Sequence, residues 1–227
     1  MITYEIKGGD LPILICYPKA GQCLKTERGA MSWMSPNMKL HTKSKAKLGN
    51  ILGRATAGEP IFLNEYRAEN EAGMIAFTAK LPGSIIPIHV TPENDVVIQK
   101  KGFLAMEDSL NMSVALQKKL TTGLFSGKGF AMQRVSGEGL IFLEINGALV
   151  EYELQAGQSM VLNTDYVAAY TGGCTMTIEP IKGINNILFG GEGLFNTIVT
   201  GPGHVYLQSM PINGMANAIN PYTTPKG

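Results

Sequence analysis

Two glycine-rich stretches of this sequence match each other: residues 124–130 read LFSGKGF, and residues 188–194 read LFGGEGL. The offset between them is 64 residues, and it holds elsewhere without insertions. The further matching pairs are 102–105 with 166–169, 111–114 with 175–178, and 137–143 with 201–207. Self-similarity at one fixed offset is typical of a domain built from repeated structural units.

A third, looser copy is divided between the two ends of the chain. Residues 58–62 (GEPIF) resemble 191–195 (GEGLF), and 21–22 resemble 157–158. Placing both termini in one unit closes a ring of three units and leaves few exposed sheet edges. We therefore predict one pseudo-threefold domain over 1–210, followed by a short helix and tail over 211–227. Its units are 58–123, 124–187, and 188–210 combined with 1–57.

Strand patterns dominate within these units. The chain contains 27 glycines and 12 prolines, many of them at turn-like positions. Residues 148–154 alternate, which places Val150, Tyr152 and Leu154 on one face of a strand and the glutamates between them on the other. The Asn146-Gly147 pair before this segment predicts a two-residue hairpin with 140–145. Only one or two short helices are expected, over 44–55 and over 212–220, the second ended by Pro221. The sequence therefore predicts an all-β protein.

The residues that usually carry catalysis form no recognisable group. The three histidines, His41, His89 and His204, lie far apart on different predicted strands, and the chain contains neither His-x-His nor Cys-x-x-Cys. Gly-x-Ser-x-Gly is also absent, so a nucleophile elbow is not indicated. We predict a protein that is not an enzyme, with no catalytic residue, metal ligand or cofactor.

The glycine-rich segments do not fit a phosphate-binding loop. The spacer in 123–129 is one residue too short for a P-loop, and Lys128 is followed by Gly where Ser or Thr is needed. The repeat explains these glycines as turns or close backbone approaches. The predicted structural turns are at Gly127, Gly129, Gly191, Gly193, Gly201 and Gly203.

The composition favours an oligomer in a reducing compartment. Charged residues make up 16% of the chain, against roughly 25% in an average soluble domain, which leaves uncharged surface for a subunit interface. The net charge of +1 does not point to nucleic acid. Three cysteines (Cys16, Cys23 and Cys174) do not make a disulfide framework. With no signal peptide or membrane-spanning run, the chain is expected to be cytoplasmic.

Two sets of residues are candidates for contact with a partner. An apolar, glycine-rich segment at each repeat junction either fills the core or forms an apolar surface patch; its candidate contact residues are Leu52, Leu124, Phe125, Leu188 and Phe189. A basic stretch either forms a solvated helix face or binds an anionic partner such as RNA or a lipid surface. Its candidate contact residues are Lys43, Lys45, Lys47 and Arg54. Without interleaved aromatic residues, nucleic acid is the less favoured of these partners.

Several segments occur in an order that resembles a known family. They are 4–6 (YEI), 29–31 (GAM), 58–62 (GEPIF), 81–87 (LPGSIIP), 102–105 (GFLA), 188–194 (LFGGEGL) and 201–208 (GPGHVYLQ). The chain resembles a bacterial member of the mitochondrial-biogenesis family named for altered inheritance of mitochondria. The resemblance implies an all-β fold similar to the trp RNA-binding attenuation protein, a double-stranded β-helix-like sandwich. It implies no catalytic residues, and mitochondrial relatives are associated with inner-membrane organisation.

Two functional hypotheses follow. The first is a non-enzymatic, homo-oligomeric β-scaffold or interaction protein, which binds a protein partner or an anionic membrane surface. The second is a binding module for a small molecule or an anionic partner. Because one fold hosts many functions, the fold resemblance does not decide between them.

Overall fold

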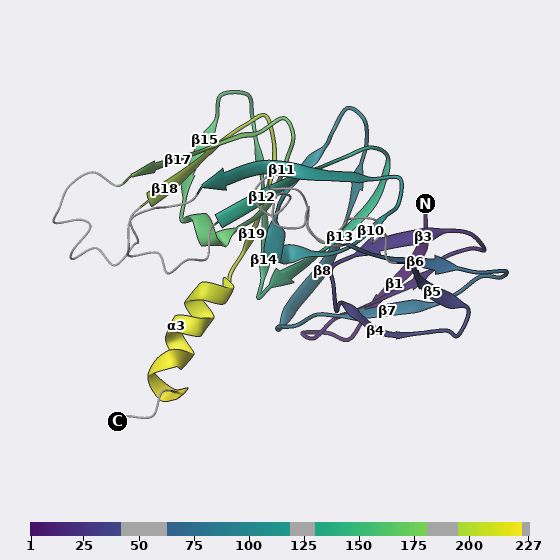
Figure 1. Ribbon diagram of the computed structural model, residues 1–227. Coiled ribbons are helices and arrows are strands. Elements are labelled where there is room, and N and C mark those ends of the chain that lie inside the picture. Colours follow the sequence, from purple (N-terminus) through teal and green to yellow (C-terminus); the bar gives the residue numbers. More distant parts are fainter. Residues whose placement is uncertain (42–62, 119–129, 181–194, 224–227) are drawn as a thin grey trace, which may run out of the picture. The chain divides into compact units, whose positions relative to one another are not determined.

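Antiparallel strands make up most of the computed structural model, which describes residues 1–41, 63–118, 130–180 and 195–223 (Figure 1). The all-β prediction is confirmed. The chain divides into two compact units, Met1–Glu144 and Ile145–Gly227. No helix among the described residues has the length and apolar character needed to cross a bilayer.

Unit 1 contains three sets of paired strands. The first set has the order β1 (Thr3–Lys7), β2 (Ile13–Tyr17), β7 (Ile75–Thr78) and β4 (Met31–Met34). The second has the order β5 (Met38–His41), β6 (Asn64–Ala68), β3 (Cys23–Thr26), β10 (Phe103–Glu107), β13 (Gly139–Asn146) and β8 (Gly83–Val90). The third has the order β11 (Asn111–Lys118), β12 (Phe130–Ser136) and β9 (Val96–Gln99), and the short 3-10 turn η2 (Lys100–Gly102) follows β9.

Unit 2 contains two sets of paired strands and a helix. The first set has the order β16 (Val167–Thr171), β19 (Gly203–Gln208) and β14 (Leu149–Leu154). The second has the order β15 (Ser159–Leu162), β18 (Phe195–Thr200) and β17 (Thr175–Pro180). The 3-10 turn η3 (Thr164–Tyr166) precedes β16, and the helix α3 (Ile212–Thr223) follows β19.

The helix α3 differs from its predicted extent. It continues through Pro221 to Thr223, whereas the sequence predicted that Pro221 would end it. A proline inside a helix removes one backbone hydrogen bond to the preceding turn. Since only two helical residues follow Pro221, little structure depends on that bond, and the last turn of the helix accommodates the proline.

The predicted hairpin at Asn146-Gly147 is wrong. β13 pairs with β10, and β14 pairs with β19 through a register that matches Leu149 with Gln208 and Leu154 with Gly203. Gly147 does adopt a positive φ of 73°, as the turn requires, but the strands on its two sides have different partners. The conformation of the turn depends on the local sequence. The partner of each strand depends instead on strands that are distant in the sequence.

One pairing scheme recurs in three successive stretches of the chain. In each stretch of six strands, the first and third pair with the sixth, and the second and fourth pair with the fifth. The stretches are β2 to β7, β8 to β13, and β14 to β19. The bounds of η2 and β10 fall 64 positions before those of η3 and β16.

Alternation along the strands builds the core of unit 1. In β2, Leu14 and Cys16 are fully buried in the core, while the residues beside them face the other side of the sheet. Tyr4 of β1 packs edge-on against Phe142 of β13, with ring centroids 4.9 Å apart. Aromatic pairs of this geometry are stabilising beyond the area that they bury.

The three thiols are part of these buried layers. Cys16, Cys23 and Cys174 are free and buried. Burial raises the pKa of Cys16 to about 12 and that of Cys23 to about 11, because a thiolate is poorly solvated there. Burial also raises the pKa of Cys174. All three side chains are therefore neutral thiols at neutral pH and behave as small apolar residues.

Two buried glutamates of unit 1 accept hydrogen bonds from backbone N–H groups. Glu107 Oε1 accepts from Ile2 N–H at 2.5 Å, and Glu107 Oε2 accepts from Leu140 N–H at 2.8 Å. Glu144 uses a single oxygen, Oε1, to accept from Lys80 N–H at 2.7 Å and Leu81 N–H at 3.2 Å. Each carboxylate thus satisfies donors that no strand partner reaches.

Unit 2 has acceptors at the positions 64 residues further along the chain. Thr171 Oγ1 accepts from His204 N–H at 3.0 Å, and Gln208 Oε1 accepts from Asn146 N–H at 3.2 Å. Gly139 and Gly203 lie beside the first acceptor of each unit with φ of 154° and 141°. A Cβ at Gly203 would collide with Thr171 Oγ1, and one at Gly139 would approach Glu107 Oε2 to 2.8 Å. Both positions therefore need glycine.

The two glutamates should differ in their tolerance of an amide. In Glu107→Gln, the NH₂ group must face one of the two N–H donors, and an unsatisfied buried donor costs about 1–3 kcal/mol of unfolding free energy. In Glu144→Gln, the remaining carbonyl oxygen can accept both bonds, so the expected loss is below about 1 kcal/mol. Urea unfolding of both variants measures the difference, and equal losses would contradict the assigned geometry.

The buried thiols predict a loss of stability at high pH. The unfolded state loses the Cys16 proton near the ordinary pKa of 9.0, while the folded state keeps it to about 12. The folded state then binds more protons, so the unfolding free energy falls as pH rises through this window, by at most about 1.4 kcal/mol per pH unit. Denaturant unfolding should show a shallower alkaline decline of the unfolding free energy for Cys16→Ala than for the wild type, and parallel pH profiles would contradict this.

Iodoacetamide should label none of the three thiols in the native protein at pH 8.

Candidate interaction surfaces

An apolar row crosses the outward face of the sheet β1-β2-β7-β4 in unit 1. The strand register places Ile15 opposite Ala76, and Trp33 opposite Ala76 on its other side. Ala76 is fully buried but lies outside the core cluster that contains its neighbours Ile75 and Phe77. The three residues therefore form a row on the face that points away from the core. We call Ile15, Ala76 and Trp33 the apolar row.

Trp33 is the exposed end of the apolar row. Its side chain is 43% exposed, and it is the only tryptophan of the chain. Beside it, the hydroxyls of Ser32 and Thr78 hydrogen-bond each other at 2.9 Å. At the other end, Lys7 Nζ lies 2.6 Å from Glu5 Oε2, and this hydrogen bond lowers the pKa of Glu5. The borders of the row are thus internally paired and carry little net charge.

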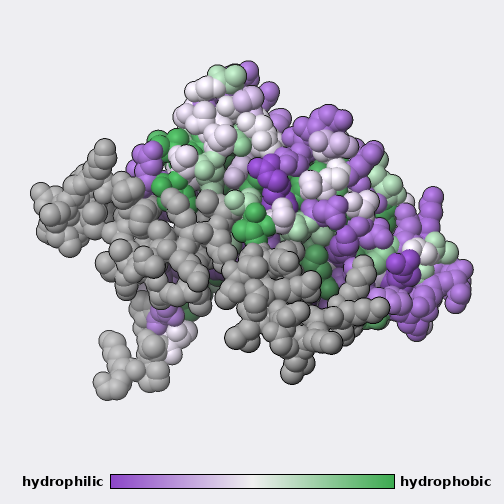
Figure 2. All heavy atoms as spheres, turned by 45° about the horizontal axis from the view of Figure 1, so that its top comes forward, coloured by the Kyte–Doolittle hydropathy of each residue, from purple (hydrophilic) through white to green (hydrophobic). Residues whose placement is uncertain are grey.

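Other apolar residues also reach the surface of the molecule. On the face of the molecule drawn in Figure 2, hydrophobic residues reach the surface in small patches between hydrophilic ones. Isolated exposed apolar residues are normal in soluble proteins, whereas aligned ones point to an interaction site. In the apolar row Trp33 is exposed, Ile15 is half-buried and Ala76 is buried, so Trp33 is the part of the row that a partner could reach directly.

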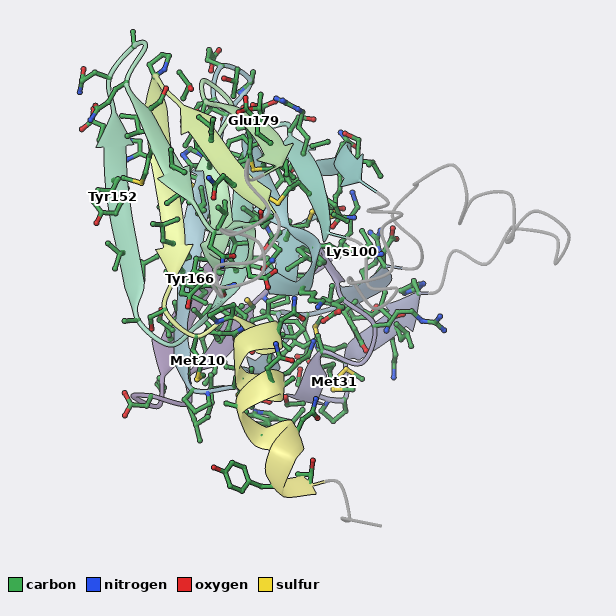
Figure 3. The ribbon with its side chains drawn as sticks, turned by 90° about the vertical axis from the view of Figure 1, so that its left-hand side faces the viewer. Met31, Lys100, Tyr152, Tyr166, Glu179 and Met210 are labelled. Atoms are coloured by element: carbon green, nitrogen blue, oxygen red, sulfur yellow. The ribbon has the colours of Figure 1, made fainter. Side chains whose placement is uncertain are left out.

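A second surface lies along β14 in unit 2, which is the last strand of its set. Val150 and Tyr152 are 43% and 44% exposed, and Glu151 and Glu153 between them are exposed as well. Figure 3 shows Tyr152 at the outer edge of the sheet. Because side chains alternate along a strand, this edge carries an apolar face and an acidic face. We call residues 150–153 the β14 edge.

The acidic face of the β14 edge contacts β19. His204 Nδ1 lies 2.7 Å from Glu151 Oε1, and the rings of His204 and Tyr206 stack with centroids 6.4 Å apart. Burial raises the pKa of Tyr206, and the nearby Glu151 carboxylate raises it further. Both partners of the His204–Glu151 pair are close to half exposed, so water screens the pair and it contributes little to stability.

Two of the histidines form surface pairs with glutamates, and the three thiols are buried. His41 lies 3.5 Å from Glu69 and His204 lies beside Glu151, each as a surface pair. Within 1–41, 63–118, 130–180 and 195–223, no three His, Cys, Asp or Glu side chains converge as a metal site would require. The neutral, buried thiols are poor nucleophiles because the thiolate is the reactive form.

Most of the candidate residues named from the sequence lie outside the described residues. These are Lys43, Lys45, Lys47, Leu52 and Arg54 in 42–62; Leu124, Phe125, Gly127 and Gly129 in 119–129; and Leu188, Phe189, Gly191 and Gly193 in 181–194. Gly201 and Gly203 are described, and they join β18 to β19. A Cβ at Gly201 would approach the carbonyl oxygen of Leu154 to 2.6 Å, so this position also needs glycine.

Neither of the two surfaces is predicted by the sequence. The alternation of Val150, Glu151, Tyr152 and Glu153 was read correctly, but nothing local indicated that their strand ends a sheet. At β4, the register shifts between Met31 and Trp33, so a simple two-residue alternation does not assign Trp33 to a face. A single tryptophan in a four-residue strand was the one available indication.

Comparison with known proteins agrees with the fold. A crystal structure of a Streptococcus pyogenes protein, solved by a structural genomics consortium, matches with a TM-score of 0.83. The match covers 98% of this chain and 100% of that one at 22% sequence identity, so it bears on the fold alone. No curated protein matches the sequence. The family model described as mitochondrial biogenesis AIM24 matches residues 4–210, and the chain belongs to this family.

Proposed function

We propose that this protein is a non-enzymatic scaffold that assembles with copies of itself through the apolar row of unit 1. The observation that carries the proposal is the alignment of Ile15, Ala76 and Trp33 on a sheet face directed away from the core. Tryptophan is enriched among the residues that contribute most to protein interfaces. The Lys7–Glu5 ion pair at one border of the row and the Ser32–Thr78 hydroxyl pair at the other suit the polar rim of such an interface.

The use of the interior polar groups supports a structural role. Glu107, Glu144, Thr171 and Gln208 each accept a backbone hydrogen bond within the β framework. A group that already satisfies a buried donor cannot give up that bond to a substrate without leaving the donor unpaired.

The three buried, unpaired thiols suit a reducing compartment, and we propose a cytoplasmic location on this basis.

The recurring pairing scheme supports an origin by internal duplication. We infer that the 64-residue offset in the sequence reflects tandem copies, one for each stretch of six strands. The closest correspondence is between β8–β13 and β14–β19, where the acceptors Glu107 and Thr171 occupy equivalent positions. Similar copies present similar sheet faces and sheet edges, which are the surfaces that a scaffold uses to bind other chains.

Substitution of Trp33 tests the assembly. Light scattering of the wild type should give a multiple of 24.4 kDa, and Trp33→Thr should shift the mass toward 24.4 kDa with an almost unchanged melting temperature. Since Trp33 is the only tryptophan, its fluorescence should also shift to the blue as the wild-type concentration rises.

The matched control is Tyr152→Thr, because Tyr152 is equally exposed but lies in unit 2. This variant should keep the wild-type mass. A wild type of 24.4 kDa at tens of micromolar would contradict the proposal, as would a Trp33→Thr variant that keeps its oligomeric mass.

A further inference from the structure

The β14 edge is an open sheet edge. β14 pairs with β19 on one side, and no strand among the described residues of unit 2 pairs with the other side. Exposed edges attract further strands, and proteins usually block them with proline, charge or a covering segment. We therefore compare how the edges of the equivalent strands β2, β8 and β14 are protected.

The outer edge of the first strand is protected differently in each of the three six-strand stretches. β2 is covered by β1, which pairs with it over five residues from Thr3–Tyr17 to Lys7–Ile13. β8 is also the last strand of its set and contains Pro87, which lies 64 positions before Glu151. A proline has no N–H to offer a new strand. Among the described residues, β14 has no covering strand, and it contains no proline; its edge carries the charges of Glu151 and Glu153 instead.

The backbone groups of Glu151 and Glu153 face away from β19, and no described strand of unit 2 pairs with them. Ser209 N–H donates to Ala148 O at 3.0 Å, so the backbone of residue 148 faces β19. In an antiparallel pair, alternate residues face the partner strand and the opposite side. His204 N–H points to Thr171 Oγ1 and away from β14, which agrees with this assignment for its register partner Glu153.

The side chains define what an added strand must carry. Residues directly opposite each other on paired strands share a face. An added strand would therefore place one set of side chains beside the carboxylates of Glu151 and Glu153 and the other set beside the exposed apolar parts of Val150 and Tyr152. Basic and apolar residues in alternation satisfy both faces.

The same geometry disfavours a second copy of this chain. Two β14 strands related by a twofold axis would place Glu151 and Glu153 of one copy beside those of the other, and like charges in directly opposed positions are destabilising. We propose that the β14 edge binds an extended segment of another protein, in which basic and apolar residues alternate, as an additional antiparallel or parallel strand. This inference goes beyond self-association and does not depend on it, because β14 lies in unit 2 and the apolar row in unit 1.

Binding of a short synthetic peptide that alternates lysine and valine tests the proposal, measured by isothermal titration calorimetry with the full chain. The wild type should bind this peptide more weakly as salt rises, and should not bind a peptide that alternates glutamate and valine. N-methyl groups on alternate residues, placed to block the strand pairing, should abolish binding. Glu151→Pro, which copies Pro87 of β8, should weaken binding about tenfold or more while leaving the melting temperature almost unchanged.

A second variant keeps the test decisive if Glu151→Pro fails to fold. Glu153→Lys should weaken binding of the lysine–valine peptide. The control is Glu179→Lys, because Glu179 is an exposed glutamate of β17 in the same unit, and this variant should bind the peptide as the wild type does. Absence of binding to the wild type, or equal binding of the N-methylated peptide, would overturn the proposal. A change of oligomeric mass in Glu151→Pro would also overturn it, because the β14 edge would then be a contact between copies.

Discussion

Backbone N–H groups that lie outside the strand ladders are the constraint on which this fold depends. A buried donor without an acceptor costs as much as several favourable contacts provide, so each one must be met where the chain leaves a strand. Here the acceptors are side chains fixed within strands: Glu107 and Glu144 in unit 1, and Thr171 and Gln208 in unit 2. Gly139 and Gly203 follow from the same requirement, because a Cβ at either position would obstruct the acceptor. The turns, the glycines and the buried polar residues are therefore parts of one arrangement.

This arrangement is the reason why the proposed function rests on surface features. Four buried polar residues (Glu107, Glu144, Thr171 and Gln208) are occupied by backbone donors, and the thiols are held neutral by burial. What the framework leaves uncommitted in the described residues is a sheet face with an exposed tryptophan and a sheet edge with two exposed glutamates. Faces and edges bind other chains, by burying apolar area and by extending the strand ladder.

The sequence predicts the features of this fold that depend on neighbouring residues, and it does not predict those that depend on distant strands. The all-β class followed from alternation and from the density of glycine and proline, and the faces of Val150 and Glu151 followed from the two-residue period. The Asn146-Gly147 turn was also recognised, but its strands were assigned to each other because short-range signals contain no information about partners as distant as β19. Trp33 was overlooked because a register shift in a four-residue strand hides which face it occupies. The family resemblance depended on segments spread from 4 to 208, and the match to residues 4–210 bears it out.

Differences between equivalent positions show which features the framework itself does not require. Glu107 and Thr171 both accept one backbone N–H at the same place in the pairing scheme, so a carboxylate is not needed for that bond alone. The extra oxygen of Glu107 accepts from Ile2, which holds the segment leading into β1, and β1 covers the edge of β2. Unit 2 has no such second bond at Thr171 among the described residues, and β14 has no covering strand there. The second oxygen of Glu107 therefore serves the attachment of β1, and the edge at β14, uncovered among the described residues, is a feature that the pairing scheme permits but does not demand.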